Sequence, residues 1–391
     1  MKKGLFQLQY ELDEVRTYTE NGADAGAKLY LDDIADEDVR REFESVMQMS
    51  YKEALRWLSS PRPTSNKAKS VAVPFTTHTP EALEYRLEGM TPQLLFVSRP
   101  LHTIERLDDY LYTISNHMPI GGYLWCHSMT AVLKRKLLLQ RYPWGVAHVL
   151  IAWDYLWHRV CPKLALTRKF YFAVSRGSKR TYNRVEILGR LYRAGYEVVD
   201  EQFRDGEFFV IARKEHKPVD DTPPTGSPII HLRRVGLGGK EIVVHKFRTM
   251  YSYSEYIQPY IYRYQSLERG GKFKNDYRVN IWGRILRRTW LDELPMLWNV
   301  LRGDLKLVGV RPLSRHYYNL YSDEMQQLRI KVKPGMLPPF YYERHTPETL
   351  EEVQQSERRY LEAYLKHPFA TDWKYFWGIV GNILFRRKRS K

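Results

Sequence analysis

The 391-residue sequence has little cysteine and no long apolar run. Its two cysteines, Cys126 and Cys161, are too few for a disulfide framework and lack the spacing of a metal-binding knuckle, so we expect reduced thiols in a cytoplasmic protein. The N-terminal residues are mixed and polar, without the apolar stretch of a secretion signal. No window reaches the roughly 18 to 20 apolar residues of a spanning helix, so no ordinary transmembrane segment is expected.

Acidic residues are outnumbered as well. The chain has 45 Asp and Glu against 62 Lys and Arg, a formal net charge of +17. This excess predicts a polyanionic partner, and nucleic acid, anionic lipid head groups and nucleotide diphosphates all qualify. The many aromatic residues, 10 Trp, 29 Tyr and 15 Phe, favour a membrane interface, although protein cores use them too.

The composition along the chain predicts four regions: a polar helical segment over 1–85, an α/β layer domain over 86–214, a proline-rich linker over 215–227 and a mixed α/β domain over 228–391 that ends in a basic tail. The strand and helix texture of 86–214, with the turn Arg193–Glu197, resembles the distal half of a class I methyltransferase in degenerate form. No glycine-rich loop precedes it, so we expect a scaffold without S-adenosylmethionine.

Four motifs in the last region stand out by their order. They are Lys246–Met250 (KFRTM), Leu291–Pro295 (LDELP), Val308–Pro312 (VGVRP) and Lys333–Gly335 (KPG). Together they resemble the bacterial sugar transferase domain of monotopic phosphoglycosyl transferases. Several motifs in one order are far more specific than any single one. The resemblance implies the mixed α/β fold of that family.

Carboxylates and basic side chains in these motifs suit phosphoryl transfer. A carboxylate can attack phosphorus and form an acyl phosphate, and the resemblance assigns this nucleophilic role to Asp292. It assigns Glu293 a catalytic role as a ligand of Mg²⁺. Basic residues that it places around the substrate diphosphate are Lys246, Arg248, Arg287 and Arg311, with Asp276 and Arg278 as possible further members of the site.

The implied reaction moves a sugar-1-phosphate from a UDP-sugar to polyprenyl phosphate, such as undecaprenyl phosphate. Such a step initiates exopolysaccharide, capsule or O-antigen synthesis. The implied location is the cytoplasmic leaflet of the inner membrane, with monotopic or peripheral attachment. Nucleic acid is not expected as a partner, because no recognition module is present.

Simpler interpretations of the same residues stay open. Asp292 with Pro295 fits a helix N-cap and first turn, which is compatible with catalysis because a helix N-terminus keeps a carboxylate ionised. The other residues could be solvated surface charges (Arg287, Arg311), outward positions of a strand (Lys246, Arg248) or a pair within a turn (Asp276, Arg278).

The sequence also departs from the family pattern. The family carries a re-entrant membrane helix before its first motif, whereas residues 213–227 here are polar and proline-rich. A candidate replacement is Trp144–Phe172, interrupted at Cys161 and Pro162. Trp373–Phe385, with the basic residues that follow it, offers a second membrane contact. A buried helix and a solvated tail are the respective alternatives.

Substitutions inside the motifs bear on activity. Trp290, Met296 and Val310 replace the usual Ser, Gln and Pro without removing a charge, but Met336–Phe340 replaces the usual Ile-Thr-Gly after the last motif. The altered loop leaves an alternative function open: a catalytically inactive, membrane-associated regulatory or scaffold relative of the family.

Overall fold

The computed structural model describes residues 73–75, 77, 79–162, 164–175, 180–204, 206–224, 226–264, 267–268, 272–273, 276–343, 347 and 349–386. Contacts divide the chain into two compact units. Unit 1 contains the residues up to Gly226 together with Ser252–Arg263, and unit 2 contains Ser227–Tyr251 together with Tyr264–Lys391. Most of the expected helical segment over 1–85, and the basic tail beyond Arg386, lie outside the described residues.

Unit 1 is built on a five-stranded sheet with the order β1-β2-β3-β5-β4. The strands are β1 (Val73–Phe75), β2 (Leu94–Val97), β3 (Tyr123–Ser128), β4 (Tyr196–Arg204) and β5 (Glu207–Lys214). The first three are parallel, and β5 runs antiparallel to both β3 and β4. All four residues of β2 are buried, as a central parallel strand requires. This sheet confirms the predicted α/β class.

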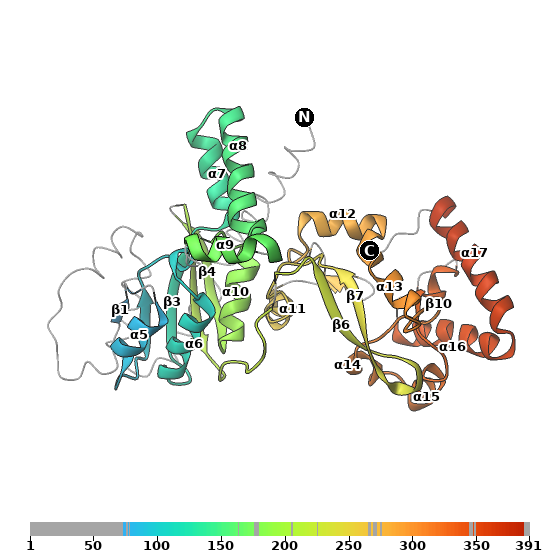
Figure 1. Cartoon of the computed structure of the whole chain (residues 1–391). Coiled ribbons are helices and arrows are strands. Elements are labelled where there is room, and N and C mark those ends of the chain that lie inside the picture. The colour runs from blue at the N-terminus through green and yellow to red at the C-terminus, as the bar shows by residue number, and fades with distance from the viewer. Residues whose placement is uncertain are drawn as a thin grey trace. The chain divides into compact units, whose positions relative to one another are not determined.

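Helices of unit 1 form two sets. Those next to the sheet are α5 (Pro80–Leu87), η2 (Leu101–Thr103), α6 (Leu107–His117) and α10 (Arg184–Arg193), followed later in the chain by α11 (Gln258–Tyr264). The second set is α7 (Ala131–Arg141), α8 (Trp144–Tyr155), the π-helical η3 (Leu156–Val160) and α9 (Ala165–Ser175). Figure 1 shows α7 and α8 side by side, extending away from the end of the sheet.

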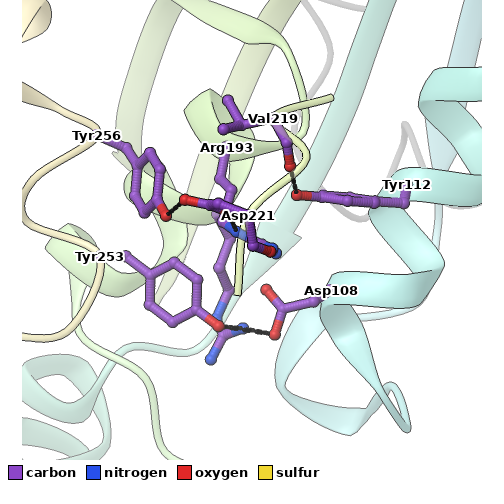
Figure 2. A network of polar contacts seen from close by, with 8 residues as sticks. Asp108, Tyr112, Arg193, Val219, Asp221, Tyr253 and Tyr256 are labelled. Atoms are coloured by element: carbon purple, nitrogen blue, oxygen red, sulfur yellow. Dashed lines mark hydrogen bonds and ion pairs between the residues drawn. The ribbon is translucent and has the colours of Figure 1, made fainter. Parts of the chain in front are cut away.

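A buried arginine attaches the segment Ser252–Arg263 to the rest of unit 1. Arg190 donates a hydrogen bond to the Tyr253 hydroxyl at 2.9 Å, lies 4.0 Å from the centre of that ring and pairs with Asp108. Tyr253 in turn donates to Asp108 at 2.8 Å (Figure 2). Burial alone would raise the pKa of Asp108, but Arg190 and Tyr253 hold it below its ordinary value. The buried Asp108 carboxylate therefore has both a charged partner, Arg190, and a hydrogen-bonded partner, Tyr253.

A second set of polar contacts holds the proline-rich segment that precedes unit 2 (Figure 2). Arg193 donates to Asp221 at 2.8 Å, and Asp221 also accepts a hydrogen bond from Tyr256. The Tyr112 hydroxyl donates to the Val219 carbonyl at 2.7 Å. This segment has no regular secondary structure among its described residues, yet α6 and α10 hold it in place through side chains.

Unit 2 combines an antiparallel hairpin with short helices. The strands of the hairpin are β6 (Ile229–Val235) and β7 (Glu241–Phe247), joined through η4 (Leu237–Gly239). The remaining strands form the pairs β8 (Leu267–Glu268) with β9 (Lys272–Phe273) and β10 (Lys306–Val308) with β11 (Gly335–Leu337). The helices are α12 (Ile281–Thr289), η5 (Leu291–Glu293), α13 (Met296–Leu301), α14 (Arg315–Tyr318), α15 (Asp323–Arg329), η6 (Pro339–Tyr341), α16 (Leu350–Lys366) and α17 (Pro368–Arg386).

The core of unit 2 includes its C-terminal helices. Tyr360 and Leu361 of α16 and Ile379 of α17 are fully buried against the β10 region. The Tyr360 hydroxyl donates to Asp372 at 2.7 Å, which joins the two helices. Helix α17 is therefore part of the folded unit. Within the part of the chain that the structure describes, no helix is both long and apolar enough to cross a bilayer.

Two glycines allow the backbones of the VGVRP and KPG motifs to lie in close contact. Gly309 follows β10 and donates its N–H to the Leu337 carbonyl at 3.1 Å, while the N–H of Gly335 donates to the Val310 carbonyl at 2.9 Å. A Cβ added to Gly335 would lie 2.2 Å from the Gly309 nitrogen. Glycine is thus required by the approach of two backbones.

We predict that Gly335→Ala lowers the free energy of unfolding of unit 2 by about 1–3 kcal/mol, because the added methyl group forces β10 and β11 apart. Gly381→Ala on α17 is the matched control, since an added Cβ there meets nothing within 4 Å. Denaturant unfolding followed by circular dichroism measures both. Equal midpoints for Gly335→Ala and the wild type would contradict the prediction.

Candidate active site

The LDELP motif lies at a sharp turn between two helices. The N-cap of helix α12 is Asn280, whose side chain accepts a hydrogen bond from the Gly283 N–H at 2.6 Å. The C-cap is Trp290, which has a left-handed backbone with φ of 62° and packs on Tyr341 at a ring distance of 4.5 Å. The chain then enters η5, so Asp292 and Glu293 point from a tight turn.

Helix α12 packs closely against the KFRTM motif. The Asn280 N–H donates to the Thr249 carbonyl at 3.0 Å. A Cβ added to Gly283 would lie only 2.0 Å from that same carbonyl oxygen. Only glycine allows this approach, and it brings Arg287, one turn further along α12, to the Thr249 hydroxyl at 2.9 Å. Two motifs that are far apart in sequence thereby share one site.

A buried asparagine holds α13 against β7. Asn299 is 0% exposed; its side-chain amide donates to the Val243 carbonyl at 2.6 Å and accepts from the His245 N–H at 3.0 Å. The Asn299 amide thus bonds two backbone groups of β7 as a neighbouring strand would. Sequence reasoning did not include Asn299 among the site residues. The available signal was a single amide within the apolar run Trp298–Leu301.

The helix attachment places Glu293 against Lys246. The Lys246 ammonium lies 2.5 Å from the Glu293 carboxylate, and both side chains are largely buried. Burial lowers the pKa of Lys246, while the charge of Glu293 opposes that shift. Lys246 is therefore not an outward strand position but part of an ion pair with a predicted site residue.

Asp292 is the unusual carboxylate of the site. Its residue is only 8% exposed, and among the described residues no hydrogen-bond partner reaches its Oδ1 atom. The N-cap positions of η5 and α13 are Trp290 and Pro295, so Asp292 does not occupy a cap. Burial, reinforced by the charge of Glu293, raises the pKa of Asp292 above its ordinary value. An unpartnered buried carboxylate oxygen is costly, and groups of this kind occur more often at functional sites than elsewhere.

Near these carboxylates, Arg311 lies within electrostatic reach of both Lys246 and Arg287. Burial lowers the pKa of Arg287, and the positive charge of Arg311 lowers it further; Arg311 also lowers the pKa of Lys246. Asp292 opposes both shifts. The exposed Arg311 thus repels two partly desolvated cations, Lys246 and Arg287, and an anion bound among the three would relieve this repulsion.

The other predicted residues are placed differently. Arg248 donates its Nε–H to the Ser227 carbonyl at 2.9 Å. Arg278 forms a two-pronged pair with Asp276, with N···O distances of 2.8 and 2.9 Å. This is the turn pair that was the simpler interpretation. Its two charges still shift the pKa of Arg287, in opposite directions, so the pair borders the cation cluster.

The residues present fit a magnesium ion only in combination with substrate. Among the residues that the structure describes, no cluster of three His, Cys, Asp or Glu side chains is suited to a metal. Mg²⁺ commonly takes one or two protein carboxylates and completes its shell with phosphate oxygens and water. The unpartnered Oδ1 of Asp292 and the adjacent carboxylate of Glu293 offer that number of ligands.

Comparison with known proteins identifies a family for the C-terminal region. Residues 222–386 match the family model of the bacterial sugar transferases, which confirms the family resemblance of the C-terminal region. All the predicted site residues fall within this stretch.

Individual relatives carry sugar transferase names. The chain is 40% identical over 112 residues to an uncharacterized sugar transferase, EpsL, of Bacillus subtilis, covering 28% of this chain and 49% of that protein. It is 38% identical over 117 residues to an undecaprenyl-phosphate galactose phosphotransferase of Salmonella typhimurium, covering 28% of this chain and 24% of that protein. A UDP-glucose:undecaprenyl-phosphate glucose-1-phosphate transferase of Xanthomonas campestris is 37% identical over 115 residues, which cover 28% of this chain and 22% of that protein. The chain thus spans half or less of each of these relatives.

A solved O-methyltransferase family protein from Burkholderia thailandensis also shows similarity, with 16% identity over 34% of this chain and 33% of that chain. The TM-score is 0.21, too low to support any argument about structure or function.

We predict that Asn299→Leu lowers the free energy of unfolding by about 1–3 kcal/mol, because it leaves the His245 N–H and the Val243 carbonyl without their partner. Denaturant titration provides the measurement. Asn319→Leu, at an exposed position, serves as the control and should change little. An equally small effect at both positions would show that Asn299 does not hold α13 to β7.

A second prediction concerns Asp292 and pH. Because the pKa of Asp292 is raised in the folded protein, its ionisation costs stability as pH rises from the ordinary aspartate value through the raised value. Asp292→Asn removes that cost, so the variant should be as stable as the wild type or more stable at neutral pH. Thermal unfolding at several pH values tests this, and the difference should shrink in acid. Clear destabilisation at neutral pH would contradict it.

Proposed function

We propose that the protein is a phosphoglycosyl transferase that moves a sugar-1-phosphate from a UDP-sugar to polyprenyl phosphate through a covalent intermediate on Asp292. The observation that carries the proposal is the buried Oδ1 of Asp292, which has no hydrogen-bond partner among the described residues, while the positive charges of Lys246 and Arg287 act on its carboxylate. A structural carboxylate would instead be expected to have its oxygens hydrogen-bonded.

In the first step an Asp292 carboxylate oxygen attacks the phosphorus that bears the sugar. A bond forms between that oxygen and phosphorus, the diphosphate P–O bond breaks, and UMP leaves with the bonding electron pair. Burial and the neighbouring Glu293 raise the pKa of Asp292, which makes the ionised carboxylate a better nucleophile than an exposed one. Below the raised pKa the carboxyl is protonated, so turnover falls in acid.

In the second step a phosphate oxygen of the acceptor attacks the same phosphorus and releases the Asp292 carboxylate. The product is a polyprenyl diphosphate sugar, and no net proton transfer is needed between the two ionised phosphates. Lys246, Arg287 and Arg311 hold the charged oxygens during both displacements. When bound, Mg²⁺ would neutralise further charge on the diphosphate, with Glu293 as its protein ligand.

The surroundings of Asp292 suit an acceptor with an apolar chain. Exposed apolar side chains flank the site on η5, on α13 and on the turn between them, namely Leu291, Leu294, Leu297, Trp298 and Leu301. Exposed leucine and tryptophan next to a buried anion site match a phosphate head group on a hydrocarbon tail. The site would then face the cytoplasmic leaflet, where nucleotide sugars and the lipid acceptor meet.

We predict that Asp292→Asn reduces UMP release by about a thousandfold or more, because it removes the nucleophile. The full-length protein is incubated with UDP-galactose or UDP-glucose, polyprenyl phosphate and Mg²⁺, and UMP is measured. Donor alone should leave a sugar phosphate on the peptide that contains Asp292, detectable by mass spectrometry, and the kinetics should be ping-pong. Asp323→Asn at an exposed position is the control and should keep full activity.

The companion variant Glu293→Gln distinguishes the role of Glu293 from that of Asp292. It should slow UMP release but still form the adduct, and added Mg²⁺ should restore part of the rate. An adduct on another residue, or normal turnover by Asp292→Asn, would refute the assignment. No UMP release by the wild type with any UDP-sugar would instead support the inactive scaffold alternative.

A further inference from the structure

One helix of unit 1 is apolar around its whole circumference and yet mostly uncovered. Helix α8 contains a single charged residue, Asp154, which pairs with Lys134 of α7. Ala147 is its only fully buried residue. A helix that is apolar on all sides is normally enclosed by protein or by lipid. In the described chain, α8 has protein neighbours on part of its surface only.

The exposed apolar surface continues onto α9. On α8 it consists of Trp144, Val146, Val149, Trp153 and Tyr155. On α9 it continues with Leu166, Phe170 and Val174, which follow each other at intervals of four residues and therefore form one stripe. Leu166 is 93% exposed and Trp153 is 63% exposed. We name residues 131–175, from α7 to α9, the helical arm.

The helical arm is internally packed, so its apolar surface is preformed. Trp157 stacks parallel to Trp153 at 6.1 Å and meets the buried Tyr171 edge-on at 5.7 Å. Arg159 links the helical arm to the rest of unit 1, because it donates a hydrogen bond to the Asn183 side chain, at the N-cap of α10, at 2.8 Å. The exposed side chains thus lie on an ordered helical support.

The charge of the helical arm identifies the partner. Residues 131–175 contain eight Lys and Arg and one acidic residue, Asp154. Lys136, Arg141 and Lys169 are exposed. Basic side chains bordering an apolar surface that is rich in Trp and Tyr match an anionic lipid interface, where the head groups meet the cations and the acyl region covers the apolar face.

Other occupants fit less well. Nucleic acid would bind the cations but leave Val149, Leu166 and Val174 without a partner. A second copy of the chain would cover the apolar face but bring two strongly positive surfaces together. Helix α8 has 12 residues, about 18 Å at 1.5 Å per residue, against a hydrocarbon core of about 30 Å. A bilayer partner would therefore be entered only to its interface.

We propose that the helical arm of unit 1 binds the surface of an anionic phospholipid bilayer, with the exposed side chains of α8 and α9 in the interfacial layer. This attachment lies outside the region that matches the sugar transferase family and does not depend on catalysis.

The test is flotation of the full-length protein with vesicles of phosphatidylcholine, with or without phosphatidylglycerol. The apolar variant is Val149→Ser/Leu166→Ser/Val174→Ser. It should lower the partition constant on mixed vesicles at least about tenfold, because three apolar side chains no longer leave water. Thermal unfolding should stay unchanged, since all three positions are exposed.

The matched control is the triple variant Tyr85→Ser/Met90→Ser/Ile120→Ser, which changes exposed apolar residues of unit 1 outside the helical arm. It should bind vesicles like the wild type. The charge variant Lys136→Glu/Arg141→Glu/Lys169→Glu should abolish the preference for phosphatidylglycerol and most of the salt dependence.

Wild-type vesicle binding by the apolar variant would overturn the proposal. So would an apolar variant that binds vesicles normally but loses a dimer in sedimentation without lipid, because the face would then join two copies. Neither readout uses donor or acceptor, so a failure here is distinguishable from a failure of the proposed reaction.

Discussion

The site depends on one amide. The Asn299 side chain hydrogen-bonds both the Val243 carbonyl and the His245 N–H and thereby fixes the position of α13 along β7. Because side chains alternate along a strand, a shift of one residue would turn Lys246 away from the helices. The contact between Lys246 and Glu293, and with it the orientation of η5, follows from this attachment. A buried amide has few alternative partners, so the register is strongly specified.

The charges held by this framework do not favour the empty folded state. Burial raises the pKa of Asp292 and lowers the pKa of Lys246 and Arg287, so each of the three charged forms is disfavoured by the fold itself. The ion pair with Glu293 offsets part of this cost for Lys246, whereas the Oδ1 atom of Asp292 has no hydrogen-bond partner among the described residues. The unfavourable burial is consistent with a bound diphosphate and metal that supply the missing counter-charges.

The strand and helix pattern of the sequence predicted the α/β class, and the order of the four motifs indicated the family resemblance. Sequence reasoning did not reach Asn299 or the contact between Thr249 and Arg287, since their partners are backbone groups or distant side chains that only the tertiary fold supplies. The same holds for Tyr253, which groups with unit 1 although it follows the first motif in the chain. Catalytic roles remain predictions, because geometry places charges without showing which bond they break.

Membrane attachment of this protein would depend on separate exposed apolar segments. The acceptor proposed for Asp292 is a lipid, yet in the described ranges no single helix spans a bilayer. The helical arm proposed to bind lipid belongs to unit 1, and the exposed Phe369, Trp373 and Trp377 of α17 belong to unit 2 and would offer a second apolar contact. Two weak contacts on one chain raise the effective concentration of each other at the surface, so together they can bind far more tightly than either alone. Such attachment stays reversible and salt-sensitive, whereas insertion of a spanning helix does not.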